Sequence, residues 1–192
     1  MIKTATLVLA TLLFSGNVLA DWTLINNESD IYFVSTKKNA VSEVHYFKQL
    51  GGEISDKGKI KIDVNLASVE THIPVRNERV KSMLFEVSKF PKATVTATID
   101  ADLIKAMPAG SSYIDSLTFT ANLHGVKQTL KTDVRVVKLL DDKVLAVSVI
   151  PVIISASQFG LEQGIEQLRK IAKLPSISTA VPVTFSLMFQ PR

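Results

Sequence analysis

The densest group of side chains that could do chemistry lies in THIPVRNERVKSMLFEVSKFP, residues 71–91. Carboxylates and imidazoles are common general acids and bases, and a guanidinium binds carboxylates or phosphates. Arg76 and Arg79 are the candidate anion ligands of the stretch. The candidate acid and base groups in and beside it are Glu70, His72 and Glu78. The question is whether these residues form an active site or support the fold.

Other patterns that carry chemistry are missing from the sequence. The three histidines, His45, His72 and His124, are isolated, and no H-E-x-x-H pair or carboxylate cluster completes a metal site. No G-x-S-x-G motif marks a nucleophilic serine, and the chain has no cysteine. We therefore expect structural roles for the histidines, with His124 in a turn before Gly125. Neither a metal nor a catalytic cofactor is predicted.

The N-terminal segment resembles a cleavable signal peptide. Lys3 precedes an apolar run over residues 5–14, and small residues lead to Ala20. Cleavage is expected after Ala20, which leaves a mature domain over residues 21–192. No later stretch approaches the roughly 18 apolar residues of a membrane helix. We expect an exported, soluble chain.

Composition limits the remaining classes of protein. An exported chain without cysteine must be stabilised by its core rather than by disulfides, and its length suits one domain. The 22 basic and 18 acidic residues are nearly balanced and evenly spread. This charge gives no indication of nucleic-acid binding.

Most of the chain alternates between apolar and polar residues, which is typical of β-strands with one face in the core. The segment KIKIDVNL, residues 59–66, shows the pattern most clearly. We expect eight strands, at residues 29–36, 41–48, 59–66, 94–100, 117–123, 126–138, 143–154 and 183–189. Turns are expected at 51–52, 55–58, 124–125 and 141–142. Such a chain forms a sandwich or an up-and-down barrel.

Two stretches have helical spacing instead. Pro74 suits the first turn of a helix that stops before Pro91. Its apolar side is Val80, Met83, Leu84 and Val87. The second stretch covers residues 157–172, with Ser157 as its expected cap. Its apolar side is Leu161, Ile165, Leu168 and Ile171. We expect both helices to lie against an apolar surface.

The order of several motifs resembles the YceI-like family of bacterial periplasmic proteins. The motifs are DWTLINNESDIYFV, HYFKQLGGEI, ASVETHIPVRNERVKSMLFEVSKFP, LTFTANLHGVKQTLKTDV and ISASQFGL. Matching positions are Ser68, Thr71, Arg76, Phe85, Pro91, Phe159, Gly160 and Leu161. Asn77 stands where the family usually has aspartate, and Glu28 where histidine often precedes the serine. The resemblance spans nearly the whole mature chain.

This resemblance implies an all-β fold, an eight-stranded antiparallel lipocalin-like barrel with one or two short helices. It implies a periplasmic, noncatalytic carrier of a polyisoprenoid such as an isoprenoid quinone or a prenyl phosphate. Arg76 and Arg79 are expected near the polar head group. The expected tunnel residues are Phe33, Phe47, Ile62, Val64, Phe85, Val95, Phe119, Leu123, Phe185 and Leu187. A small barrel has room for one such ligand.

Two other functions stay open at this point. One is a partner protein that presents a surface, or delivers a quinone, to a membrane cytochrome or redox system. The other is a lipid hydrolase or isomerase that uses Glu70, His72 or Glu78 as acid and base. The sequence also leaves open the identity of the lipid, transient contact with the membrane, and whether the chain forms a homodimer.

Overall fold

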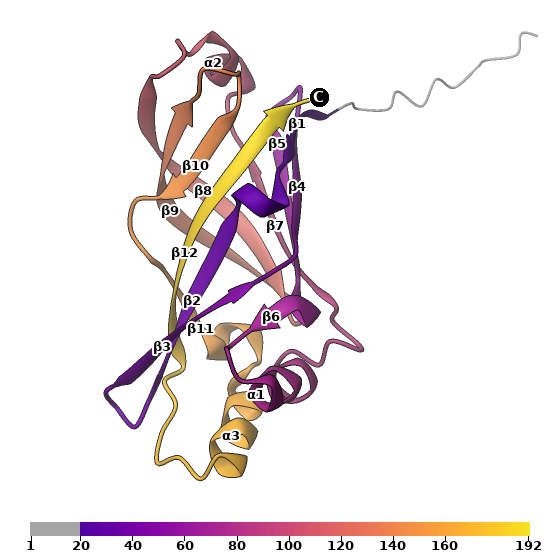
Figure 1. The fold of residues 1–192 in the computed structure, drawn as a ribbon, viewed down its shortest axis with the longest axis vertical. Coiled ribbons are helices and arrows are strands. Elements are labelled where there is room, and N and C mark those ends of the chain that lie inside the picture. Colours follow the sequence, from indigo (N-terminus) through magenta and orange to yellow (C-terminus); the bar gives the residue numbers. More distant parts are fainter. Residues whose placement is uncertain (1–19) are drawn as a thin grey trace, which may run out of the picture.

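The computed structural model describes residues 20–192, with side chains from Trp22 onward. The expected signal peptide therefore lies outside the described residues, apart from the backbone of Ala20. The described chain folds into a tall β-barrel with helices at both ends (Figure 1). Among residues 20–192, no helix is long and apolar enough to cross a membrane.

Eight antiparallel strands form a closed ring, which confirms the predicted barrel. The ring closes where Trp22 of the first strand pairs with Pro191 of the last. Alternating side chains then point into the barrel and away from it. In ring order the strands are β1 (Ala20–Leu24), β4 (Leu50–Ser55), β5 (Lys59–Asn65), β7 (Lys92–Thr98), β8 (Ser112–Leu123), β9 (Val126–Lys138), β10 (Val144–Ser148) and β12 (Ala180–Pro191).

Four further strands continue members of this ring. They are β2 (Asp30–Lys37), β3 (Val41–Phe47), β6 (Val69–Glu70) and β11 (Val152–Ser155). Strand β12 pairs with β1 and then β2 along one edge, and with β10 and then β11 along the other. Short breaks, such as the 3-10 turns η1 (Asn26–Glu28) and η2 (Leu66–Ser68), separate the paired segments. The predicted strand at residues 143–154 is thus divided at 149–151.

The turn predicted at residues 51–52 is wrong, because both glycines lie inside β4. A Cβ at Gly52 would meet Ile62 Cδ1 at 2.6 Å and Leu24 Cδ1 at 3.3 Å. The glycine is therefore required by close packing between strands and not by a turn. The turns at 55–58, 124–125 and 141–142 are confirmed. His124 occupies its turn with a φ of 54°.

Three α-helices and several short turns complete the fold. The helix expected from Pro74 is α1 (Pro74–Arg79), and it continues as the π-helical turn η3 (Val80–Leu84) before ending well ahead of Pro91. Helix α2 (Ala101–Ala106) was not predicted, and Asp100 caps it by accepting a hydrogen bond from the Leu103 amide. It covers one end of the barrel (Figure 1).

The helix expected from Ser157 begins later than predicted. Residues Ala156–Phe159 form the 3-10 turn η4, and Gly160 has a φ of 68°, which ends that turn. Helix α3 (Glu162–Ile171) follows without a side-chain cap. Ser157 is therefore not the cap, because the left-handed residue separates it from the helix.

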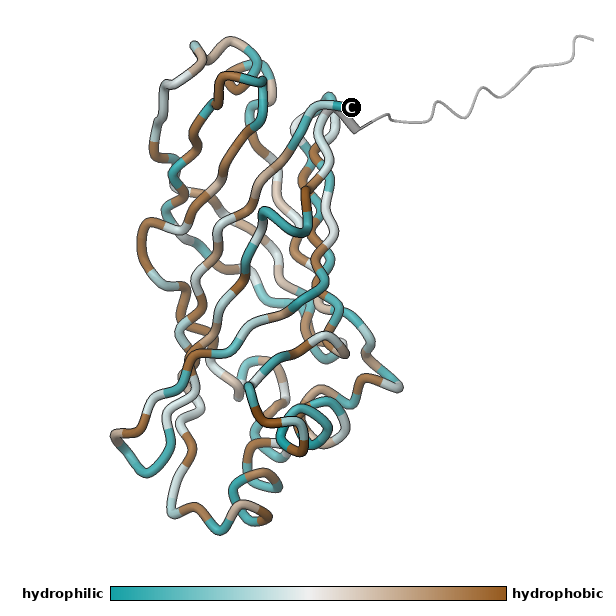
Figure 2. Tube along the Cα trace, viewed as in Figure 1, coloured by the Kyte–Doolittle hydropathy of each residue, from teal (hydrophilic) through white to brown (hydrophobic). Residues whose placement is uncertain are grey.

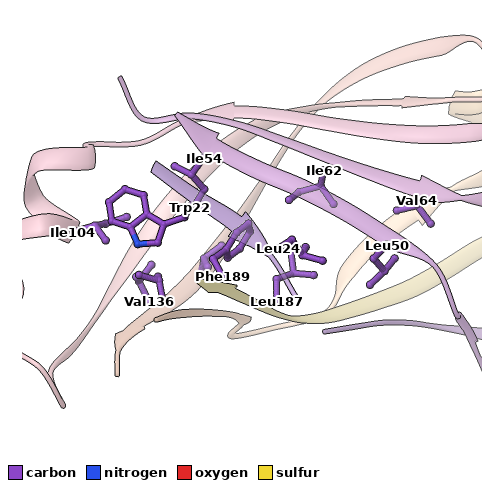
Figure 3. Close-up of a cluster of buried hydrophobic side chains, with 12 residues drawn as sticks. Trp22, Leu24, Leu50, Ile54, Ile62, Val64, Ile104, Val136, Leu187 and Phe189 are labelled. Atoms are coloured by element: carbon purple, nitrogen blue, oxygen red, sulfur yellow. The ribbon is translucent and has the colours of Figure 1, made fainter. Parts of the chain in front are cut away.

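One end of the barrel, called the Trp22 end, is filled by large side chains. Trp22 is 4 % exposed and lies among Ile54, Ile104, Val136 and Phe189, all pointing into the interior (Figure 3). Ile104 comes from α2, so this helix closes the Trp22 end. Two ammonium groups, from Lys105 and Lys138, each lie 5.8 Å from the centre of the indole ring, a distance typical of cation–π contacts.

The other end, called the helical end, is covered by α1, η3 and α3. Helix α3 packs against η3 at Gly164, where a Cβ would approach the Met83 carbonyl oxygen to 2.7 Å and Leu84 Cα to 2.9 Å. Val80 and Phe85 turn inward from this cover onto Leu66 and Val69. The apolar side predicted for residues 74–90 therefore packs against the barrel.

Candidate binding cavity

A cavity of about 290 Å³ lies inside the barrel. Its lining reaches from Ile104 at the Trp22 end to Leu84, Phe85 and Ile165 at the helical end. Every strand of the ring except β1 contributes side chains to it. Its volume is at the lower limit of the range for small-molecule sites, roughly 300–1,000 Å³.

The cavity exists because small residues occupy inward positions between large ones. Five alanines line it: Ala93, Ala97, Ala121, Ala146 and Ala156. On β8, for example, Ala121 lies between the inward-facing Phe119 and Leu123, and it pairs with Val95 on β7. Larger side chains at these positions would fill the space, as they do at the Trp22 end.

All ten apolar residues predicted for the tunnel line this cavity. They come from six strands and from Phe85 just after η3, so the fold brings together residues that lie far apart in sequence. The prediction from strand alternation therefore identifies cavity walls. Contact of these residues with a bound molecule stays a prediction.

The lining is almost entirely apolar, with a few polar groups on the β8–β9 side. The hydroxyl of Thr132 is buried and has no hydrogen-bond partner among the described residues. Tyr113 and Asp115 lie on the same inward face of β8. Burial, and then the nearby Asp115 carboxylate, raise the pKa of the Tyr113 hydroxyl above its usual value. These groups were not identified from the sequence, because nothing in it shows that β8 extends past the end of β7.

Asp115 is the exposed residue among those that line the cavity, and from this we infer that the cavity opens beside it. Strand β7 ends at Thr98 and pairs with β8 only as far as Phe119. The part of β8 from Ser112 to Thr118 therefore lacks a strand partner on that edge. We expect a ligand to enter at this unpaired edge, because the covers at the two ends would not have to move.

The two predicted arginines do not line the cavity. Arg76 donates a hydrogen bond from Nη1 to Glu43 Oε2 at 2.8 Å and another from Nη2 to the Thr71 carbonyl. Lys37 Nζ also binds Glu43 Oε2, at 2.6 Å. Arg76 is drawn to the β2–β3 hairpin because Glu43 offers a partly buried carboxylate there. Arg79 has no hydrogen-bond or ion-pair partner among residues 20–192 and lies outside the lining.

A polar cluster nevertheless lies next to the cavity at the helical end. Glu43 and His45 precede the cavity residue Phe47 on the inward face of β3, and the His45 ring lies against that of Phe33 at a tilt of 58°, with ring centres 5.1 Å apart. His45 is 3 % exposed, and its Nε2 is 2.8 Å from Ser35 Oγ. Burial, and then the charge of Arg76, lower the pKa of His45 to about 4. The imidazole is therefore neutral near pH 7.

The candidate acid and base groups are not arranged for catalysis in the cavity. Glu70 accepts hydrogen bonds from the Asn77 side chain, from Lys48 and from the backbone amide of His72. These bonds, with Asn77 first, lower the pKa of Glu70 to about 2. His72 stacks on Tyr46, and Glu78 pairs with Lys81 at the surface. None of these candidate groups lines the cavity.

Asn77 explains much of the charge density around residues 71–91. Its side chain accepts hydrogen bonds from the amide and hydroxyl of Thr71 and donates one to Glu70. Thr71 is 1 % exposed, so this network fixes the entry of the chain into α1. The stretch that first suggested chemistry is therefore mainly structural.

A closed eight-stranded barrel around an apolar cavity defines a binding protein of the lipocalin-like type. Residues 22–189 match the model of the YceI-like domain. The chain therefore belongs to the YceI-like family. No curated protein sequence matches the chain.

Solved structures of three bacterial proteins have the same fold. A polyisoprenoid binding domain from Saccharophagus degradans, implicated in plant cell wall breakdown, is 36% identical. The match covers 91% of this chain and 100% of that one, with a TM-score of 0.89. Burkholderia cenocepacia BcnA is 19% identical over 86% of this chain and 98% of its own, with a TM-score of 0.67. A Campylobacter jejuni YceI protein is 15% identical over 99% and 94%, with a TM-score of 0.56.

Proposed function

We propose that this chain is a noncatalytic periplasmic carrier that holds a polyisoprenoid-type lipid, such as an isoprenoid quinone or a prenyl phosphate, in its barrel. The observation that carries the proposal is the apolar cavity, which extends between the two covered ends and has the exposed Asp115 in its lining. The relative from Saccharophagus degradans, described as a polyisoprenoid binding domain, supports the same ligand class. The resemblance of the N-terminal segment to a cleavable signal peptide supports the compartment.

The size of the cavity sets how much of a chain it encloses. An apolar cavity of about 150 Å³ binds benzene, so 290 Å³ holds roughly ten carbon atoms, or two isoprene units. Burying that length contributes about 8 kcal/mol at ~0.8 kcal/mol per carbon group, before ordering costs. A longer isoprenoid would extend through the opening beside Asp115 or displace flexible side chains. Most of the affinity comes from the tail.

A cavity-blocking substitution tests the proposal. Ala121→Trp places a large ring inside the barrel, whereas Thr120→Trp puts the same ring on the outward face of the same strand. Binding of a tritiated polyprenol, measured by gel filtration, should be lost in A121W and kept in wild type and T120W. Circular dichroism checks that both variants fold. Equal binding by all three proteins would place the lipid outside the barrel and contradict the proposal.

A further inference from the structure

The surface of the helical end combines exposed apolar side chains with unpaired cations. Val41 and Val44 of the β2–β3 hairpin are 44% and 54% exposed. Ile73 and Val75, at the start of α1, are 42% and 55% exposed, and Ile171, at the end of α3, is 47% exposed. Hydrophobic residues alternate with hydrophilic ones along all three elements (Figure 2). These five side chains are called the apolar tips.

Bonds between the three elements hold the apolar tips at the same end of the barrel. On β3, Val44 points outward, whereas Val41 lies on the face that carries Glu43 and His45. The hairpin is joined to the segment after α3 by a hydrogen bond from the Lys38 amide to the Ser176 carbonyl, 3.1 Å long. The Arg76–Glu43 ion pair joins α1 to the hairpin. Since α3 packs on η3, the helices and the hairpin form a single end of the molecule (Figure 1). Together the three elements place exposed apolar side chains across this end of the molecule.

Tyrosine rings extend this face along the barrel wall. Tyr46 lies next to Val44 on β3 with a single inward residue between them, so both side chains point outward. Its ring centre is 6.0 Å from that of Tyr32 and 5.8 Å from that of His72, which precedes Ile73. Tyrosine side chains, with an apolar ring and a polar hydroxyl, are enriched where proteins meet the membrane–water interface.

The positive charge of the chain is concentrated at this end. Segments 37–43, 74–84 and 162–174 contain eight basic and four acidic residues, a net charge of +4. The formal net charge of all 192 residues is also +4, so the rest of the chain is neutral on balance. The acidic residues that form ion pairs here are Glu43, Glu78 and Glu166. Lys38, Lys173 and Arg79 have no ion-pair partner among the described residues.

We propose that the helical end docks on the surface of an anionic lipid bilayer, with the apolar tips inserted at the head groups and the unpaired cations beside the lipid phosphates. Clustered basic residues bind anionic membranes electrostatically, and apolar tips add burial. The docking proposal rests on the proposed carrier function, because docking matters only if the chain carries a lipid. The segments η3 and α3 that cover this end also contribute Leu84 and Ile165 to the cavity lining, so docking places the bilayer against this cover of the cavity.

A charge-reversal pair tests the docking surface with vesicles that contain no isoprenoid. The variant K38E/K173E reverses two unpaired cations at the helical end. The control K57E/K59E makes the same change at the opposite end, in and beside the β4–β5 turn, where both lysines are exposed. The wild type should cosediment with phosphatidylcholine–phosphatidylglycerol vesicles and much less with phosphatidylcholine alone. K38E/K173E should bind at least roughly 30-fold more weakly, from about 1 kcal/mol for each basic residue lost.

The control variant should bind like the wild type, and salt should weaken the binding of both. Equal loss in the two variants, or no binding by the wild type, would overturn the proposal. If a second copy of the chain covers this surface instead, sedimentation velocity should show a dimer that V44D dissociates, and the vesicles should bind no protein. That result would also overturn the docking proposal. Polyprenol binding by the same variants is measured separately. Failure of docking therefore leaves the cavity test intact.

Discussion

Protonation of His45 should make the stability of the barrel depend on pH in a defined range. The pKa of this buried imidazole is about 4 in the folded chain, against 6.5 for an ordinary histidine. Between these values the unfolded chain binds a proton that the folded chain does not. The free energy of unfolding therefore falls as the pH falls. From the two pKa values, the loss between pH 7.5 and pH 5.0 is about 2 kcal/mol.

Urea unfolding at the two pH values measures this loss. Trp22 is the one tryptophan of the chain and is buried, so its fluorescence reports unfolding. His45→Gln keeps a polar partner for Ser35 but cannot titrate. Between pH 7.5 and pH 5.0, the free energy of unfolding of the Gln variant should change by less than about 0.5 kcal/mol, which is the size of effect typical of a surface substitution. A wild-type protein with equal stability at both pH values, or a Gln variant with the full loss, would refute the reasoning.

Two further predictions concern the helical cover and the opening. Gly164→Ala should lower the free energy of unfolding by about 1–3 kcal/mol, since the new Cβ meets backbone atoms of Met83 and Leu84. The control Gly51→Ala should lower it less, because no atom lies within 4 Å of the new Cβ. A larger loss for Gly51→Ala in urea unfolding would contradict the packing of α3 on η3. Asp115→Asn should raise the affinity for a prenyl phosphate roughly two- to fivefold, with little change for the uncharged prenol. Equal changes for both ligands in a competition assay would show that the carboxylate lies away from the head group.

Strand alternation predicted much of the barrel, because an inward-facing residue in every second position is a direct result of the pleat. It could not predict β1, whose five residues are too short to show a period, nor the role of Gly52. Glycines usually mark turns, but Gly52 serves close packing between neighbouring strands. Helix α2 was missed because only six residues form it, and its cap is a single aspartate.

The site was predictable where one strand decided the direction of a side chain, as for Phe119 and Phe185. It was not predictable where tertiary partners decided it. Arg76 is drawn out of reach of the cavity by Glu43, which is 33 residues away in sequence. The sequence shows His45 only as an isolated histidine, because its burial next to Phe33 depends on how the strands pack. The opening at Asp115 follows from unequal strand lengths, which alternation does not reveal.

Native mass spectrometry of the protein purified from its host cells without detergent tests the central claim most directly. The intact protein should carry a mass excess that disappears on extraction with organic solvent, and the extract should contain a molecule built of isoprene units. A121W purified in the same way should lack the excess, and T120W should keep it. A wild-type protein that is repeatedly empty, or whose bound molecule contains no isoprene units, would contradict the account.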